Sequence, residues 1–218
     1  NANFGGNGNF GGNGNFGGNG NFGGNGGPAG GGGFGEPGPA PAPVRARSNE
    51  ASRARANQFV GFGDEHFRQQ KYNEALERYK DASKSAPDLA APYFRQAFAW
   101  AAMTRYDQAA KALHRGLSID AQWPAGDFQL KQLYGDNRLA KRGHWEAMAK
   151  AATENPQDAN LLFLLAVELY CDGQRDRSRA FFQRAKALEP GDPSHITAFI
   201  SQLGPGAAPA GAPPMAVQ

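Results

Sequence analysis

The residues with the greatest capacity for chemistry in this sequence are four histidines and one cysteine. The histidines are His66, His114, His144 and His195. No two of them stand four residues apart, the spacing that places two metal ligands on one face of a helix. Cys171 lacks the second cysteine that a disulfide or a multi-cysteine zinc site requires. These spacings predict neither a metal centre nor a catalytic site.

Two short patterns resemble functional motifs but have simpler interpretations. Asp64-Glu65-His66 contains possible metal ligands, yet neighbouring residues on a helix point in different directions, so surface charge is the better interpretation. Gly61-Phe62-Gly63 lacks the third glycine and the preceding strand of a dinucleotide-binding loop. We interpret Cys171 as a small, half-buried residue. The chain is therefore expected to be neither an enzyme nor a cofactor carrier.

Charge and hydropathy narrow the class of partner. Residues 56–203 carry 19 Lys and Arg against 18 Asp and Glu. The positive excess lies in residues 45–55, which we interpret as a solvated basic linker and not as a nucleic-acid site. No apolar run reaches the roughly 18 residues that a membrane span needs. We therefore expect a protein partner. The arginines of the linker are Arg45, Arg47, Arg53 and Arg55.

A 34-residue repeat organises the middle of the chain. Residues 56–89, 90–123 and 159–192 each predict two amphipathic helices with small residues at matching places. Small residues let two antiparallel helices approach closely, and larger ones fill the space between neighbouring pairs. The small residues are Gly63, Ala97 and Ala166 in the first helices and Ala75 and Ala109 in the second, and the larger ones are Tyr79, Leu113 and Phe182.

This pattern resembles the tetratricopeptide repeat (TPR), a helix–turn–helix unit of 34 residues. The resemblance covers Ala56 to about Asp192. It implies an all-α, right-handed helical solenoid of about four helix pairs plus a capping helix, extending over residues 56–203. Such arrays stack their pairs side by side and cover the last exposed face with a cap.

The third unit of the expected solenoid, residues 124–158, has the right length without the repeat pattern. Gln132, His144 and Met148 stand where small, small and aromatic residues are expected. We predict a degenerate unit here, with helices at 127–134 and 138–152. The capping helix is expected at 193–203, followed by a flexible Gly/Pro/Ala tail at 204–218.

By resemblance to TPR proteins, one side of each first helix faces a concave groove that binds peptides. The groove positions Phe94 and Phe98 cannot serve a carboxylate, and neither can Val60 and Asp64. We therefore expect apolar or aromatic partner segments. The alternative, that several of these aromatic residues pack on neighbouring helices, stays open. The candidate groove residues are Val60, Phe67, Phe94, Phe98, Leu133, Phe163, Val167 and Tyr170.

Residues 1–44 form a glycine-rich arm with 19 of the 30 glycines and a single charge, Glu36. The hexapeptide NFGGNG occurs four times, and glycine occupies eleven of the twelve places taken in steps of three from Gly5 to Gly38. Such a segment cannot bury a core of its own. It is suited to packing as an extended chain against other chains, or else it is a disordered tail. Its candidate assembly residues are Phe4, Phe10, Phe16 and Phe22.

Two functional classes follow from these observations. The first is a non-catalytic self-assembly protein, an extracellular fibre or envelope scaffold subunit that uses its arm. The alternative is a soluble TPR adaptor that binds an apolar peptide of another protein in its groove. The arm and the Asn at position 1 favour the first class and an extracellular or cell-envelope location, with the cytoplasm as the alternative.

Overall fold

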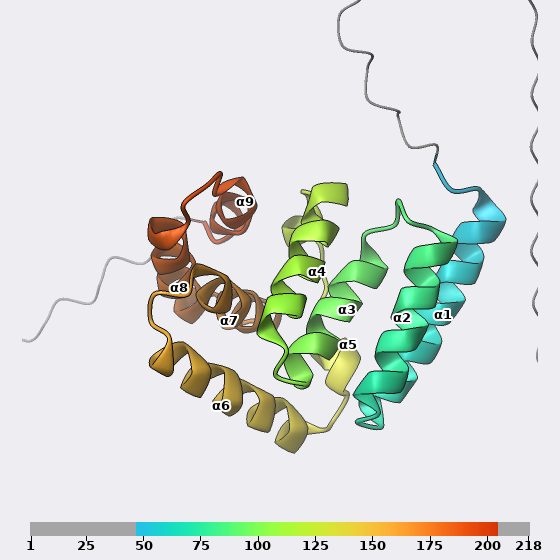
Figure 1. Cartoon of the computed structure of the whole chain (residues 1–218), viewed down its shortest axis with the longest axis horizontal. Helices are drawn as coiled ribbons and strands as arrows, with labels where there is room; N and C mark the ends of the chain where they lie inside the picture. Colours follow the sequence, from blue (N-terminus) through green and yellow to red (C-terminus); the bar gives the residue numbers. More distant parts are fainter. Residues whose placement is uncertain (1–46, 205–218) are drawn as a thin grey trace, which may run out of the picture. The chain divides into compact units, whose positions relative to one another are not determined.

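Three helix hairpins form the framework of the protein in a computed structural model that describes residues 47–204 (Figure 1). The glycine-rich arm, which includes Phe4, Phe10, Phe16 and Phe22, and the tail after Gly204 lie outside the described residues. The prediction of an all-α fold with paired helices is confirmed for the described part. The hairpins are α1 (Glu50–Arg68) with α2 (Tyr72–Ser85), α3 (Ala91–Ala102) with α4 (Tyr106–Ile119), and α7 (Ala159–Cys171) with α8 (Arg175–Leu188).

The turn of each hairpin has the same backbone conformation at the same place of the repeat. Gln70, Thr104 and Gly173 have φ angles of 61°, 59° and 79°, and each is the fifteenth residue of its unit. A left-handed conformation is uncommon for residues other than glycine, most of all for a β-branched one such as Thr104. Its recurrence at three equivalent places therefore indicates that the three hairpins are structural repeats of one another.

The first helix begins inside the segment expected to be a linker. The side chain of Asn49 accepts a hydrogen bond from the backbone N–H of Ser52 and caps α1 at Glu50. Arg53, one of the four linker arginines, forms an ion pair with Asp88 beyond the end of α2. Residues 50–55 thus extend α1 by almost two turns, because they have both a cap and a tertiary contact.

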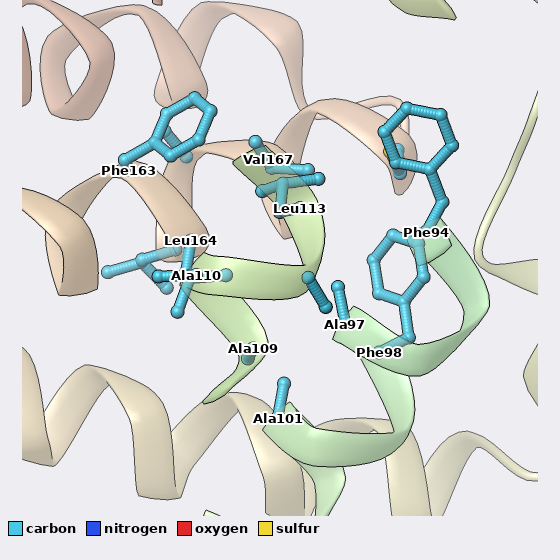
Figure 2. Packing of buried hydrophobic residues seen from close by; sticks show 14 of the residues in the cluster. Phe94, Ala97, Phe98, Ala101, Ala109, Ala110, Leu113, Phe163, Leu164 and Val167 are labelled. Atoms are coloured by element: carbon cyan, nitrogen blue, oxygen red, sulfur yellow. The ribbon is translucent and has the colours of Figure 1, made fainter. Parts of the chain in front are cut away.

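Small residues on α3 bring it close to α4, as the repeat predicted. In Figure 2, Ala97 and Ala101 of α3 face α4, where Ala109 lies. Phe94 and Phe98 lie one turn apart on another side of α3. The same close approach occurs in the first hairpin, where Gly63 packs against the ring of Tyr79. Close packing of this kind leaves no space for an added methyl group.

Two glycines on α1 provide a matched test of this packing. A Cβ atom on Gly63 would overlap the Tyr79 ring, whereas nothing lies within 4 Å of a Cβ atom on Gly61. We expect Gly63→Ala to lower the free energy of unfolding by about 1–3 kcal/mol because the hairpin must open. Gly61→Ala should raise it by about 0.5–1 kcal/mol, since alanine favours the helix. Urea denaturation of both variants measures the difference, and equal effects would contradict the packing of α1 on α2.

The expected third repeat unit does not take a place in the stack of hairpins. Instead α7 packs directly against α4. Residues 120–158 form the 3-10 helix η1 (Trp123–Ala125), the single-turn α5 (Lys131–Tyr134) and the long α6 (Arg138–Glu154). The prediction placed a helix at 127–134, but regular structure begins only at Lys131 and ends at Gly135, whose φ is 55°. A helix of one turn cannot form a hairpin with α6.

The capping helix is present as α9 (Ser194–Gln202), which packs on α8 and η1. Its Ile196 and Phe199 are fully buried, whereas Thr197 on the same helix is exposed. Phe199 contacts three aromatic rings of α7 and α8. The amphipathic character of residues 193–203 thus corresponds to a helix that covers the end of the stack.

Among residues 47–204, no helix combines the length and the apolar character needed to cross a membrane.

Candidate functional site

The link between α4 and α6, residues 120–137, lies across the first helices of all three hairpins; we call it the strap. Trp123 stacks on Phe94 of α3, with ring centroids 4.0 Å apart and planes at 21°. Tyr134 meets Phe67 of α1 edge to face, with ring centroids 5.0 Å apart. The strap thus covers the side of α1 and α3 that the TPR resemblance assigns to the peptide groove.

Two places in the strap, at Pro124 and at Leu130, are anchored to α7. Near the first end, the hydroxyl of Tyr170 on α7 donates a hydrogen bond of 2.6 Å to the carbonyl of Pro124. Further along, the N–H of Leu130 donates to the carbonyl of Cys171 at 3.0 Å. The side chains of Leu130 and Leu133 are fully buried. These two regions therefore belong to the core of the domain.

The loop between the two anchors is held differently. Ala125, Gly126, Asp127 and Gln129 are exposed, and only the half-buried Phe128 points its ring at the domain. This ring lies 5.3 Å from that of Phe98 and 5.6 Å from that of Trp123, and the guanidinium of Arg95 lies 4.3 Å from its centroid. We call the side chains of Phe98, Arg95 and Trp123 the Phe128 socket.

Arg95 is fixed in the socket by an ion pair. Its Nε lies 2.9 Å from Oδ1 of Asp64, and the two side chains are only 13% and 16% exposed. Asp64 also accepts a hydrogen bond of 2.8 Å from the hydroxyl of Tyr79. A guanidinium with one edge on a carboxylate can still present its face to an aromatic ring. The surface charge expected of Asp64 is therefore a structural ion pair between α1 and α3.

The structure places seven of the eight candidate groove residues in the interior, and only Val60 is partly exposed. The strap covers Phe67, Phe94 and Phe98, and Leu133 is part of the strap itself. Val167 of α7 lies beside Leu113 of α4 (Figure 2), and Phe163 meets Phe182 of α8 and Phe199 of α9. These residues are thus packed against the chain's own helices and strap. A role of these eight residues in binding a partner stays a prediction.

A cleft of about 520 Å³ lies beside the Phe128 loop. Its walls come from the strap, the start of α6 and the end of α7. Lys141 and Asp172 form an ion pair across it. Because both cations and anions line the cleft in similar numbers, neither sign of charge dominates. The charged residues are Lys131, Arg138, Lys141 and Arg175 with Asp127, Asp136 and Asp172.

Helix α7 carries a buried carboxyl group, that of Glu168. Glu168 is 2% exposed, and its Oε2 atom has no hydrogen-bond partner. Burial, and then the neighbouring Asp172, raises the pKa of Glu168 to about 8. Burial also raises the pKa of the Cys171 thiol. Since the thiolate is the nucleophilic form of cysteine, burial makes this thiol a poor nucleophile at neutral pH.

Two of the four histidines come together, which their sequence positions did not indicate. The rings of His114 on α4 and His195 on α9 lie 4.2 Å apart, and Nε2 of His114 lies 3.2 Å from Oδ1 of Asn160. Burial, followed by the charge of His114, lowers the pKa of His195. His144 on α6 forms a hydrogen bond of 2.8 Å with the hydroxyl of Tyr134. These histidines therefore hold elements together.

Sequence reasoning did not identify three residues of this site, Trp123, Phe128 and Arg95. Trp123 and Phe128 lie where the 34-residue pattern loses its regularity, so no periodic position marks them. That loss of regularity was the available signal, because an irregular segment inside a repeat array indicates an insertion with its own contacts. Arg95 stands next to a predicted groove position, and only its ion pair with Asp64 reveals its direction.

Comparisons with known proteins give the following results. No family model and no curated protein matches the chain. The similar solved structures include the first TPR domain of Spaghetti (RPAP3) bound to HSP90 peptide SRMEEVD, 13% identical over 69% of this chain and 93% of that one, with a TM-score of 0.35. Another is the Sgt2 TPR domain from Aspergillus fumigatus, 10% identical over 73% and 82%, with a TM-score of 0.35.

A third is PilF of Pseudomonas aeruginosa, 13% identical over 71% of this chain and 70% of that one, with a TM-score of 0.35. The paired helices, the repeated turn and the small-residue contacts of the described residues define a TPR-like fold. Domains of this class generally serve protein–protein interaction without catalysis.

Proposed function

We propose that the protein is a non-catalytic adaptor that binds an aromatic segment of a protein partner on the strap-covered side of α1, α3 and α7. The observation that supports this proposal is the Phe128 socket. Its aromatic and guanidinium groups already hold a phenylalanine from a loop whose other residues are exposed. A surface that holds one aromatic side chain from an irregular loop has the shape and chemistry to hold another.

The chemistry of the site defines the class of partner. An aromatic ring in the socket is stabilised by the ring of Phe98 and by the cation of Arg95. An aliphatic side chain there would be stabilised only by the burial of its apolar surface. The adjacent cleft has both signs of charge, so it suits a polar segment with little net charge. The preferred ligand is therefore a polar peptide with a phenylalanine, tyrosine or tryptophan as its anchor.

Selection from a random 12-residue peptide library on the full chain tests this proposal. We expect the selected peptides to share an aromatic anchor and to bind Phe128→Ala about five- to tenfold more tightly than wild type. The reason is that a peptide can bind wild type only when the Phe128 ring has left the socket. The small population of that state lowers the apparent affinity of wild type for the peptide. Fluorescence anisotropy measures the dissociation constants.

Phe62→Ala is the matched control, because Phe62 is an exposed phenylalanine on α1, 49% accessible to solvent. It should leave the affinity of the selected peptides unchanged. Peptides without an aromatic anchor, or peptides that bind Phe128→Ala and wild type equally, would contradict binding at the socket.

Self-assembly through the arm is a second candidate function, favoured by the four identical NFGGNG repeats. In this proposal the protein is a subunit of an extracellular fibre or cell-envelope scaffold. Repeated weak contacts add avidity, since each further contact is intramolecular once the first has formed. Glycine at every third place matters where another backbone lies against that edge.

Changing Gly14 and Gly20 to Val should therefore prevent assembly by blocking this close approach. Sedimentation velocity of the intact chain and the double variant measures the result. An intact chain that is already monomeric at high concentration would remove self-assembly and leave the adaptor.

A further inference from the structure

The loop that carries Phe128 contains nearly the same tripeptide as the arm. The loop has Gly126-Asp127-Phe128, and the arm has Gly-Asn-Phe three times, ending at Phe10, Phe16 and Phe22. Asparagine and aspartate side chains have almost the same shape and differ in charge. Asp127 is exposed, so an asparagine in its place would leave the insertion of the Phe128 ring unchanged. The Phe128 socket therefore holds the phenylalanine of a Gly-Asp-Phe tripeptide, and the arm has the closely similar Gly-Asn-Phe in three copies.

The structure allows the Phe128 loop to leave the socket without unfolding the strap. The anchors at Pro124 and Leu130 lie on either side of the loop and make their hydrogen bonds to α7. Between them only the ring of Phe128 is inserted, and it is half-buried. Withdrawal of this one ring frees the face of Phe98 and of Arg95 while the fully buried Leu130 and Leu133 stay in place.

We propose that a Gly-Asn-Phe repeat from the arm of a second copy of the chain replaces Gly126-Asp127-Phe128 in this socket. The proposal rests on the adaptor function above and names its partner. The exchange preserves the ring–ring and cation–ring contacts, because one phenylalanine replaces another. The polar cleft next to the loop lies open to the Asn and Gly residues on either side of the incoming ring.

The number of repeats favours the second copy over the chain's own loop. Residues 47–204 of each chain form one such socket, and the arm has several phenylalanines in the same repeat, so a bound arm still presents further repeats to other chains. The three Gly-Asn-Phe tripeptides of one arm raise the probability that a socket is occupied. Each chain donates its arm to one neighbour and accepts the arm of another in its socket, so the chains become linked. The six-residue spacing of phenylalanine in the arm thus offers one socket-binding ring per repeat.

Sedimentation velocity of the full chain over a range of concentrations tests the proposal. Phe128→Ala should shift association to about fivefold lower concentration, because the competing ring is gone. A variant with Phe4, Phe10, Phe16 and Phe22 all changed to Ala should not associate, with or without Phe128→Ala. Phe62→Ala, the exposed-phenylalanine control, should behave as wild type. Circular dichroism verifies that every variant is folded.

A second measurement keeps the test independent of the stability of the variants. A labelled peptide NFGGNGNFGGNG is titrated into the chain in which the four phenylalanines of the NFGGNG repeats are alanine, with and without Phe128→Ala. We expect about five- to tenfold tighter binding with Phe128→Ala, and no binding by the peptide in which both phenylalanines are alanine.

Three results would overturn the proposal. One is association that persists without the arm phenylalanines, and another is occupancy of the socket that does not depend on protein concentration, which indicates the chain's own arm. The third is failure of the arm peptide to bind while library-selected aromatic peptides bind the socket. That last result would leave the adaptor function intact and exclude the arm as its partner.

Discussion

Replacing Phe199 with Ala is expected to lower the free energy of unfolding by about 3–5 kcal/mol. Phe199 is fully buried at the contact between α9 and the last hairpin. Its ring stacks on that of Phe182 at 5.0 Å between centroids and meets Phe163 and Tyr170 edge to face. Removing the ring leaves a cavity beneath the capping helix that the surrounding helices cannot fill.

Trp123 also depends on this helix, since its ring lies 6.1 Å from that of Phe199. Loss of α9 contacts should therefore loosen the start of the strap as well as the end of the stack. Deleting residues 193–203 should cost more than Phe199→Ala, because Ile196 is lost as well. Urea denaturation followed by circular dichroism measures the change.

Thr197→Ala is the control on the same helix, because Thr197 is exposed. Its effect should stay within about 0.5 kcal/mol of wild type. A cost below about 1 kcal/mol for Phe199→Ala would mean that α9 does not cap the stack in solution.

Replacing Glu168 with Gln is expected to raise the free energy of unfolding by about 3 kcal/mol at pH 7. The folded pKa of Glu168 is about 8, above its ordinary value of 4.5. At pH 7 the folded chain therefore holds this proton, whereas the unfolded chain releases it. Ionisation stabilises only the unfolded chain, and glutamine removes that advantage.

The direction of the pH dependence follows from the same difference. The folded chain binds more protons than the unfolded chain between pH 4.5 and about 8, so stability falls as pH rises through this range. Below pH 4.5 the carboxyl is protonated in both states, and the advantage of Glu168→Gln should disappear. The wild type should thus lose stability with rising pH relative to the variant.

Urea denaturation of wild type and Glu168→Gln at pH 4, 6 and 8 measures this effect. Glu154→Gln serves as the control, since Glu154 is an exposed carboxylate at the end of α6. That variant should differ from wild type by less than about 1 kcal/mol throughout. A Glu168→Gln difference that stays constant with pH would show that this carboxyl is ionised in the folded chain.

The helix hairpins could be predicted from the sequence because their determinants are local and periodic. Gly63 and Ala97 recur 34 residues apart, and each allows the close contact between the two helices of its own pair. Side chains within one hairpin are at most about thirty residues apart along the chain. The spacing of small and large residues therefore predicts which of them contact each other. The capping helix follows from the same rule.

The strap was decided by tertiary structure alone. The ring of Trp123 stacks on Phe94, and the ring of Tyr134 meets Phe67 edge to face. The backbone N–H of Leu130 donates a hydrogen bond to the carbonyl of Cys171. None of these contacts repeats along the chain, so no periodicity predicts them. A segment of the right length but the wrong pattern was therefore expected to be a third helix pair, whereas its apolar residues are buried across three other helices.

The candidate site shows the same division. Sequence identified Phe94 and Phe98 as aromatic residues on one side of a first helix, because a helical spacing of four places them together. It did not reveal that Arg95 and Trp123 complete a socket there for Phe128, or that one carboxyl oxygen of Glu168 is buried without a hydrogen-bond partner. Helix periodicity fixes which residues share a face, but what covers that face depends on contacts between residues far apart in the chain.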